Sequence, residues 1–188
     1  MIKKIKVATI ACIMVASVAT AKEHHPKSGE FYIVTKALLT TAETIEEGSD
    51  VTLEGDVGGG VGVDIGYTLP YHFAVELDTS YSQNRVTESK VGEEEKKDGI
   101  ASYWTYAMDV TYTIPLTEVI GIMGKVGYEF EHEHINNLDT DGDDSGMVYG
   151  AGVEYHVSEH YEALVEYEGS TIESPRGSSV YAGVKYIF

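Results

Sequence analysis

The fold is decided by the stretch Val180-Tyr181-Ala182-Gly183-Val184-Lys185-Tyr186-Ile187-Phe188 at the end of the chain. Apolar or aromatic residues occupy every second position from Val180 to Phe188, and Lys185 stands among the intervening ones. A period of two places alternate side chains on opposite faces of a β-strand. The chain therefore ends in a strand that has one apolar face and one partly polar face.

The same alternation recurs along the chain and predicts eight strands, at about 30–39, 59–69, 73–82, 103–113, 120–131, 149–157, 161–168 and 180–188. Short turns near 69–72, 114–118 and 158–160 alternate with long connections at about 40–58, 83–100, 135–146 and 169–178. An even number of strands with alternating short and long connections is typical of a transmembrane barrel. The sequence thus predicts an all-β, eight-stranded antiparallel up-and-down transmembrane β-barrel, with short periplasmic turns and long extracellular loops.

The first residues predict export. Lysines precede an apolar stretch at 7–18, and Ala19-Thr20-Ala21 fits a cleavage site, so we expect a signal peptide over residues 1–21 and a barrel domain over 22–188. Cys12 is the only cysteine and lies in this segment. A lipoprotein site there is an alternative, but Thr9 stands where such sites usually carry leucine.

The charge excludes one class of partner. The whole chain carries a net charge of −18; without Lys3, Lys4 and Lys6 it has ten Lys and Arg against 31 Asp and Glu, which gives −21. Such acidity argues against nucleic acid as a partner. The part after residue 21 has no apolar stretch of the length of a membrane helix, so any membrane crossing would use strands.

Each predicted strand separates charge from apolar side chains. A charge that faces lipid costs about 2–4 kcal/mol at the membrane midplane, so charged positions are expected to face the interior. A soluble, lipocalin-like barrel, with the apolar face inside, is the alternative. The charged face holds Lys36, Asp64, Glu76, Asp78, Asp109, Lys125, Glu129, Glu131, Glu154, Glu162, Glu166, Glu168 and Lys185.

Aromatic residues on the apolar face form two groups. One group lies beside the short turns and the chain end: Tyr67, Phe73, Tyr112, Tyr155, Tyr161, Tyr186 and Phe188. The other lies toward the long loops: Tyr81, Trp104, Tyr106, Tyr128, Phe130, Tyr149 and Tyr167. Two bands predict the interfacial girdles of a membrane barrel, whereas a soluble core needs no such bands.

The segments Gly60–Tyr67 with Phe73–Leu77, Tyr149–Tyr155 with Tyr161–Tyr167, and Ala182–Phe188 resemble the OmpA-like and porin-like outer-membrane β-barrel domains. The resemblance implies location in the cell outer membrane, contact with its lipid and lipopolysaccharide, and assembly by the barrel-assembly machinery through the C-terminal strand. Tyr186 and Phe188 would form the assembly signal. It implies a monomer without a cofactor, in a group that includes porin-like proteins, structural barrels and adhesins.

The predicted interior holds ten acids and three lysines, while Arg85 and Arg176 fall in predicted loops. Unpaired buried carboxylates are costly, so water or protonation must relieve them. One hypothesis is a hydrated, narrow, cation-favouring pore; the alternative is a filled polar interior without transport. A further alternative is a surface adhesin or ligand-binding barrel that acts through its acidic loops 40–58 and 83–100.

Two stretches suggest metal ligands. Asp139, Asp141 and Asp143 place oxygen ligands at alternate positions, as in the first half of a calcium loop. Two positions depart from that motif. Gly142 is at the fourth position, whereas the motif has its glycine at the sixth, and Gly150 is at the twelfth, where the motif has a glutamate. His132 and His134 share a strand face, a spacing that can chelate a transition metal. The alternatives are a solvated acidic turn and exposed histidines.

We do not expect an enzyme. A lipid-modifying barrel would need a serine–histidine pair on its outer, lipid-facing side. The close pair His156 and Ser158 falls at a short periplasmic turn, with His156 on the interior face.

Overall fold

The computed structural model describes residues 28–47, 50–92, 95–137 and 140–188; the predicted signal peptide lies outside them. Hydrogen-bonded strands account for most of this part of the chain, and one short 3-10 turn, η1 (Pro70–His72), joins two of them. The strands are β1 (Phe31–Thr40), β2 (Thr44–Glu47), β3 (Val51–Gly55), β4 (Gly58–Thr68), β5 (Phe73–Lys90), β6 (Lys97–Pro115), β7 (Ile120–Asn136), β8 (Thr140–His156), β9 (Tyr161–Ser170) and β10 (Ser179–Ile187).

Eight of the strands close into an antiparallel barrel, which confirms the predicted fold. Neighbours in sequence pair from β4 to β10, and β1 closes the barrel by pairing with both β4 and β10. Closure leaves no free edge within the barrel wall, the condition for a sheet that faces lipid. No helix among the described residues is long and apolar enough to cross a membrane.

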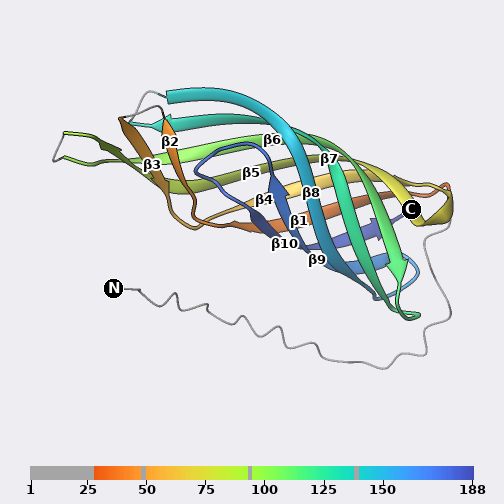
Figure 1. Ribbon diagram of the computed structural model, residues 1–188. Helices are drawn as coiled ribbons and strands as arrows, with labels where there is room; N and C mark the ends of the chain where they lie inside the picture. Colours follow the sequence, from red (N-terminus) through yellow and green to blue (C-terminus); the bar gives the residue numbers. More distant parts are fainter. Residues whose placement is uncertain (1–27, 48–49, 93–94, 138–139) are drawn as a thin grey trace.

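The two ends of the barrel differ (Figure 1). At the short-turn end, η1 and the connections at 116–119 and 157–160 link the strands, and β10 ends beside them. At the long-loop end, β2, β3 and the β5–β6 hairpin project beyond the barrel wall. The loop between β9 and β10, residues 171–178, also lies at this end and is called the mouth loop below.

The two faces of the wall carry opposite side chains. Ile65 is 56% exposed on the outer face, while its neighbour Asp64 is 3% exposed on the inner face. On β1, Phe31, Leu39 and other apolar residues point outward and Lys36 is buried, which agrees with the predicted parity. The charged face is therefore inside and the apolar face outside, as expected for a barrel in lipid.

Three of the four predicted long loops are largely strand. The segment 83–100 is mostly strand, because β5 continues to Lys90 and β6 begins at Lys97; the segment 135–146 is likewise strand, apart from a short connection. The segment 40–58 contains β2 and β3. Arg85 accordingly lies in a strand and is exposed, not in a loop.

These additional strand residues form an extension of the barrel, which we define as 44–47, 51–55, 83–90, 97–103, 132–136 and 140–147. Its strands pair in the order β2–β3–β5–β6–β7–β8. Its inner face contains a buried hydrophobic cluster of Leu53, Val86, Ala101, Tyr103 and Ile135. The extension therefore has a hydrophobic core of its own, outside the barrel wall proper.

Candidate functional site

All thirteen predicted interior charges are buried inside the barrel. They comprise ten carboxylates and three ammonium groups, contributed by all eight barrel strands. Ten of them line the barrel over most of its length: Lys36, Asp64, Glu76, Asp78, Asp109, Lys125, Glu129, Glu154, Glu166 and Lys185.

Two lysines organise the centre of the interior. The Lys36 Nζ lies 2.8 Å from Asp64 Oδ1 and 2.6 Å from Asp78 Oδ2. The Lys125 Nζ lies 2.8 Å from Glu166 Oε1 and 2.5 Å from Glu168 Oε2. Asp78 also lies 3.7 Å from the Lys125 Nζ, so that one carboxylate joins the two clusters.

Tyr181 of the C-terminal strand lies between these groups. Its hydroxyl donates a hydrogen bond to Glu168 Oε1 at 3.1 Å, and the Lys36 Nζ lies 4.3 Å from the centre of its ring. A cation over an aromatic face is an attractive arrangement, stronger where water is excluded. The ring thus fills the interior and stabilises one of its cations.

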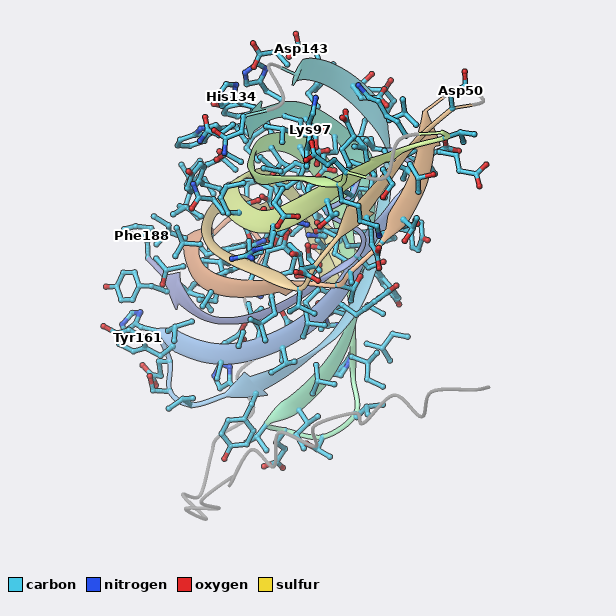
Figure 2. The ribbon with its side chains drawn as sticks, turned by 90° about the vertical axis from the view of Figure 1, so that its left-hand side faces the viewer. Asp50, Lys97, His134, Asp143, Tyr161 and Phe188 are labelled. Carbon is cyan, nitrogen blue, oxygen red and sulfur yellow. The ribbon has the colours of Figure 1, made fainter. Side chains whose placement is uncertain are left out.

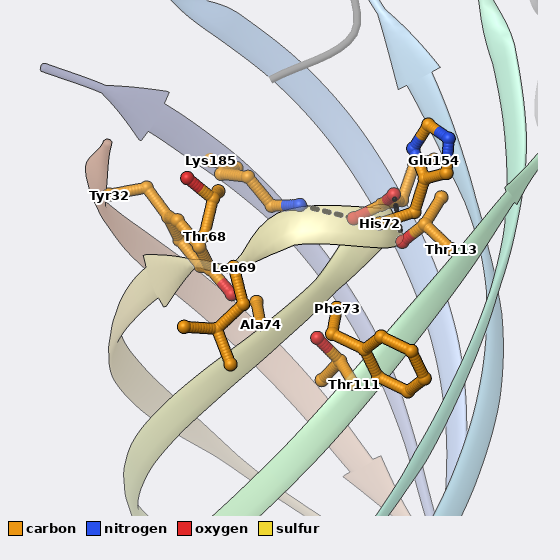
Figure 3. Close-up of a pocket in the computed structure, with 10 residues that line it drawn as sticks. All are labelled: Tyr32, Thr68, Leu69, His72, Phe73, Ala74, Thr111, Thr113, Glu154 and Lys185. Atoms are coloured by element: carbon orange, nitrogen blue, oxygen red, sulfur yellow. Dashed lines mark hydrogen bonds and ion pairs between the residues drawn. The ribbon is translucent and has the colours of Figure 1, made fainter. Parts of the chain in front are cut away.

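Lys185 organises the short-turn end (Figure 3). Its Nζ pairs with Glu154, and lies 3.0 Å from Glu162 Oε2. Thr113 donates a hydrogen bond to the other Glu154 oxygen at 3.0 Å. A small cavity of about 50 Å³ opens beside this pair, lined by Tyr32, Thr68, Leu69, His72, Phe73, Ala74, Thr111, Thr113, Glu154 and Lys185.

The mouth loop enters the opposite end of the barrel. The Arg176 Nη2 lies 2.9 Å from Glu129 Oε1, and its Nε lies 2.9 Å from Glu131 Oε2. Burial alone would lower the pKa of the Arg176 guanidinium, but Glu129 and Glu131 hold this pKa above its ordinary value. Asn84 fixes the adjacent backbone by donating to the Pro175 carbonyl at 3.0 Å. Arg176 is therefore a fourth interior cation, although its chain position is in a loop.

Side chains fill the interior in this conformation. The side chains of Lys36 and Lys125 have no solvent-accessible surface, so no water-wide passage runs past them. Ten carboxylates nevertheless face four strong cations, Lys36, Lys125, Lys185 and Arg176. The interior keeps an acidic excess even after its ion pairs are counted.

Sequence reasoning missed two groups at this site. Tyr181 has the inward parity of the C-terminal strand, which could have placed it inside beside Lys185. Arg176 carried no such signal, because a loop has no period that assigns a face.

The predicted calcium and histidine ligands lie on the outer face of the extension. His132 Nδ1 lies 2.7 Å from Asp143 Oδ1, and His134 Nδ1 lies 2.5 Å from Asp141 Oδ1; Figure 2 shows His134 and Asp143 close together, apart from Tyr161 and Phe188. Both aspartates belong to β8 rather than to a loop, and Asp139 lies outside the described residues. Among described residues, no group of three or more His, Cys, Asp or Glu is arranged to hold a metal.

The chain end packs on the outer surface of the short-turn end. Phe188 is 69% exposed, and its ring centre lies 5.1 Å from that of Tyr186. The Phe188 N–H donates to the Phe31 carbonyl at 3.0 Å. Tyr186 also contacts Tyr161, so the last strand contributes to an aromatic band at this end.

Comparison with protein families agrees with this architecture. Residues 8–188 match the model of the outer membrane protein beta-barrel domain. Among curated protein sequences, no significant match is found.

Solved structures with this fold include OprG from Pseudomonas aeruginosa, with a TM-score of 0.71 and 14% identity over 88% of this chain and 98% of OprG. Neisserial surface protein A matches with a TM-score of 0.58 and 13% identity, over 84% of this chain and 97% of that protein. Ail of Yersinia pestis, bound to the heparin analogue sucrose octasulfate, matches with a TM-score of 0.56 and 17% identity, over 86% and 100%. At these identities the likeness concerns the fold alone.

Proposed function

Because this chain belongs to the outer membrane protein beta-barrel domain family, we propose that it is a cation-favouring conduit of the outer membrane, closed in the conformation described above. The observation that carries this proposal is the acidic excess of the interior, ten carboxylates against four strong cations. A low-dielectric wall lined by one sign of charge attracts counter-ions and repels co-ions. The same excess disfavours a passage for anions.

The mouth loop supplies the closure in this proposal. Arg176 occupies the acidic interior and pairs with Glu129 and Glu131. Withdrawal of the loop would remove one cation from the interior and expose two carboxylates at the entrance. Loop movement would therefore open the long-loop entrance and increase its preference for cations, and conduction would also require the ion-paired centre at Lys36 and Lys125 to rearrange.

Planar-bilayer recording of Arg176→Ala tests this proposal. We expect the variant to conduct more often than the unaltered barrel, with a reversal potential in a KCl gradient that indicates cation selectivity. Arg85→Ala is the matched control, because Arg85 is exposed on the outer face of β5. Heat-dependent gel mobility checks that each barrel folds. The proposal is wrong if Arg176→Ala conducts no more than Arg85→Ala, or if its current is anion-selective.

A covalent lock separates loop movement from a general loosening. Thr41 and Ser178 extend the β1–β10 register by one pair, and the Thr41 N–H donates to the Ser178 carbonyl. We expect Thr41→Cys/Ser178→Cys, oxidised in the Arg176→Ala background, to suppress the current until a reductant is added.

Neutralising Glu76, Asp78 and Glu166 should in turn reduce cation selectivity in the open variant.

A second candidate function is binding at the cell surface through the extension. The supporting observation is the buried cluster that includes Val86, Tyr103 and Ile135, since it holds the exposed strands as a defined surface. Ail was crystallised with a polyanion, whereas the outer face here carries exposed Glu46, Asp98 and Asp143. The partners favoured by charge are thus cationic. Deletion of residues 44–55, followed by a cell-binding assay, tests this function.

We also propose that the aromatic bands contact outer-membrane lipid and lipopolysaccharide, and that the barrel-assembly machinery reads the C-terminal strand. The contact between half-buried Tyr186 and exposed Phe188 supports the second point. Phe188→Ala should lower the amount of assembled barrel in cells, whereas Phe31→Ala, which removes an exposed ring at the same end, should lower it less. Equal losses would contradict the proposed signal.

A further inference from the structure

The first part of β8 is a strand edge with a partner on one side only. Pairing between β7 and β8 runs without interruption from Ile120↔Tyr155 to Ile135↔Thr140. Pairing between β8 and β9, in contrast, starts only at Val148↔Ser170. Among the described strands, residues 141–146 therefore pair with β7 alone. Such an edge presents backbone donors and acceptors to an incoming chain.

The direction of these backbone groups follows from Met147. Its N–H donates to Thr171 Oγ1 at 2.9 Å, and its carbonyl accepts the Thr171 N–H at 2.9 Å, so both point away from β7. Backbone groups alternate in direction along a strand, and those of Asp141, Asp143 and Ser145 thus point to the same open side. The Asp144 carboxylate already accepts the Ser145 N–H at 2.7 Å.

An acidic cavity of about 180 Å³ lies between this edge and the mouth loop. The mouth loop packs closely on β8 at Gly146, where an added Cβ would come within 2.6 Å of Thr171 Oγ1. Beyond that point the loop and the edge diverge. The carboxylates of Glu131, Asp144 and Glu173 are among the groups that line the resulting space.

We propose that the β8 edge at residues 141–145 binds an extended, lysine- or arginine-rich polypeptide segment as an added β-strand, with one basic side chain in the acidic cavity. Strand addition supplies affinity through main-chain hydrogen bonds, and the cavity supplies selectivity through a side chain. This inference rests on the second proposed function, binding through the extension. It specifies the place and the chemistry of the partner.

Charge decides between a basic partner and a second copy of this chain. The other free edge of the sheet is β2, which is also acidic. Glu46 lies in β2 and Glu43 directly precedes it, and both side chains are exposed. Asp141 and Asp143 on the β8 edge have exposed side chains. Like charges directly opposite each other destabilise strand pairs, so pairing between copies is disfavoured and a basic strand is favoured.

Proline at position 143 tests the main-chain contact. The Asp143 N–H faces the open side, so Asp143→Pro removes an edge donor without removing a β7–β8 hydrogen bond. Asp143→Ala is the matched control, since it removes the same carboxylate and keeps the N–H. The probe is a fluorescent peptide that alternates lysine with threonine and valine, titrated by anisotropy against the barrel in lipid nanodiscs. We expect binding to the proline variant to be about tenfold weaker than to the alanine variant.

Neutralising the cavity tests the charge. Asp144→Asn/Glu173→Gln should weaken the lysine peptide and reduce the salt dependence of binding, whereas Asp98→Asn, on the outer face of β6, should change little. Equal binding to Asp143→Pro and Asp143→Ala, or equal binding of a glutamate-containing peptide, would overturn the inference. In that case, a barrel that no longer binds cells after deletion of residues 44–55 would leave the second proposed function intact. Cell binding that is unchanged by the deletion would contradict both proposals.

Discussion

The wall of the barrel and its extension use the same strands with opposite hydrophobic patterns. On β5, Glu76 is buried in the wall while Leu77 is 56% exposed on the outside. Further along the same strand, Val86 is fully buried in the extension while Arg85 is exposed. The sheet does not change register between the two regions, because β5–β6 pairing is continuous from Phe73↔Tyr112 to Glu88↔Lys97.

This difference follows from the solvent outside each region. In the wall, lipid is outside, so apolar side chains face outward and charges face one another inside. In the extension, water is outside, so the apolar side chains of Leu53, Val86 and Ile135 pack inward. The inversion comes just beyond the aromatic band that includes Tyr81, Trp104 and Phe130 on the outer face, where an interfacial girdle is expected at the outer boundary of the membrane.

The largest difference is expected between interior and extension lysines. Lys125→Met leaves several buried carboxylates without their shared cation, and should destabilise the barrel by about 3–5 kcal/mol. Lys97→Met changes an exposed side chain of the extension, and should alter stability by less than about 0.5 kcal/mol. Urea unfolding in lipid vesicles measures both. Similar losses would show that the two regions tolerate unpaired charge alike.

A lysine placed on the outer face tests the change of solvent directly. Val126 on β7 is 50% exposed in the wall, and Ile100 on β6 is 40% exposed in the extension. Val126→Lys should cost about 2–4 kcal/mol because the charge enters lipid. Ile100→Lys should stay within about 0.5 kcal/mol because it enters water. A large loss of unfolding free energy for Ile100→Lys would indicate that the membrane boundary lies beyond the extension.

Removal of one methylene from the extension should have a smaller, local effect. Ile135→Val, in the buried cluster, should cost about 0.5–1.5 kcal/mol. We expect faster amide hydrogen exchange in residues 83–90 and 132–136, and unchanged exchange in the wall. Ile122→Val, on the lipid-facing side of the same strand, is the control. Faster exchange throughout the barrel would mean that wall and extension unfold together.

The smallest effect is expected for the exposed pairs on the outer face of the extension. Asp143→Ala removes the contact with His132, in which both side chains are at least half exposed. Exposed ion pairs contribute about 0.2–1 kcal/mol. The change in unfolding free energy should fall in or below this range, and a larger value would assign the pair a structural role.

The wall was largely predictable from sequence, because one rule holds throughout it: a charge cannot face lipid. The positions of Lys36, Glu76 and Lys185 on the inner face follow from parity alone. The extension was not predicted, because its pattern inverts. Apolar Val86, Ala101 and Ile135 lie on the face that carries charge in the wall. The apolar face of each strand therefore changes side where the extension begins, and the predicted strands stop at that point.

The contacts of the mouth loop could not be predicted from sequence. Arg176 is 47 residues from Glu129, and the turn geometry that directs it inward has no periodic signature. The acidic excess was visible in the sequence, but its partial compensation by Arg176 was not. Tyr181 was accessible to parity reasoning, since it alternates with outward-facing Val180 and Ala182.

The seam between β1 and β10 has a consequence for folding kinetics. It joins Tyr32 to Ile187 and thus the first and last barrel strands. This is the longest-range pairing among the described strands, and such pairings form slowly. Tyr181 reaches Lys36 only across this seam. Until the seam forms, water reaches the interior charges, so their desolvation coincides with closure. Barrel closure and burial of the charges should therefore appear as one late kinetic step.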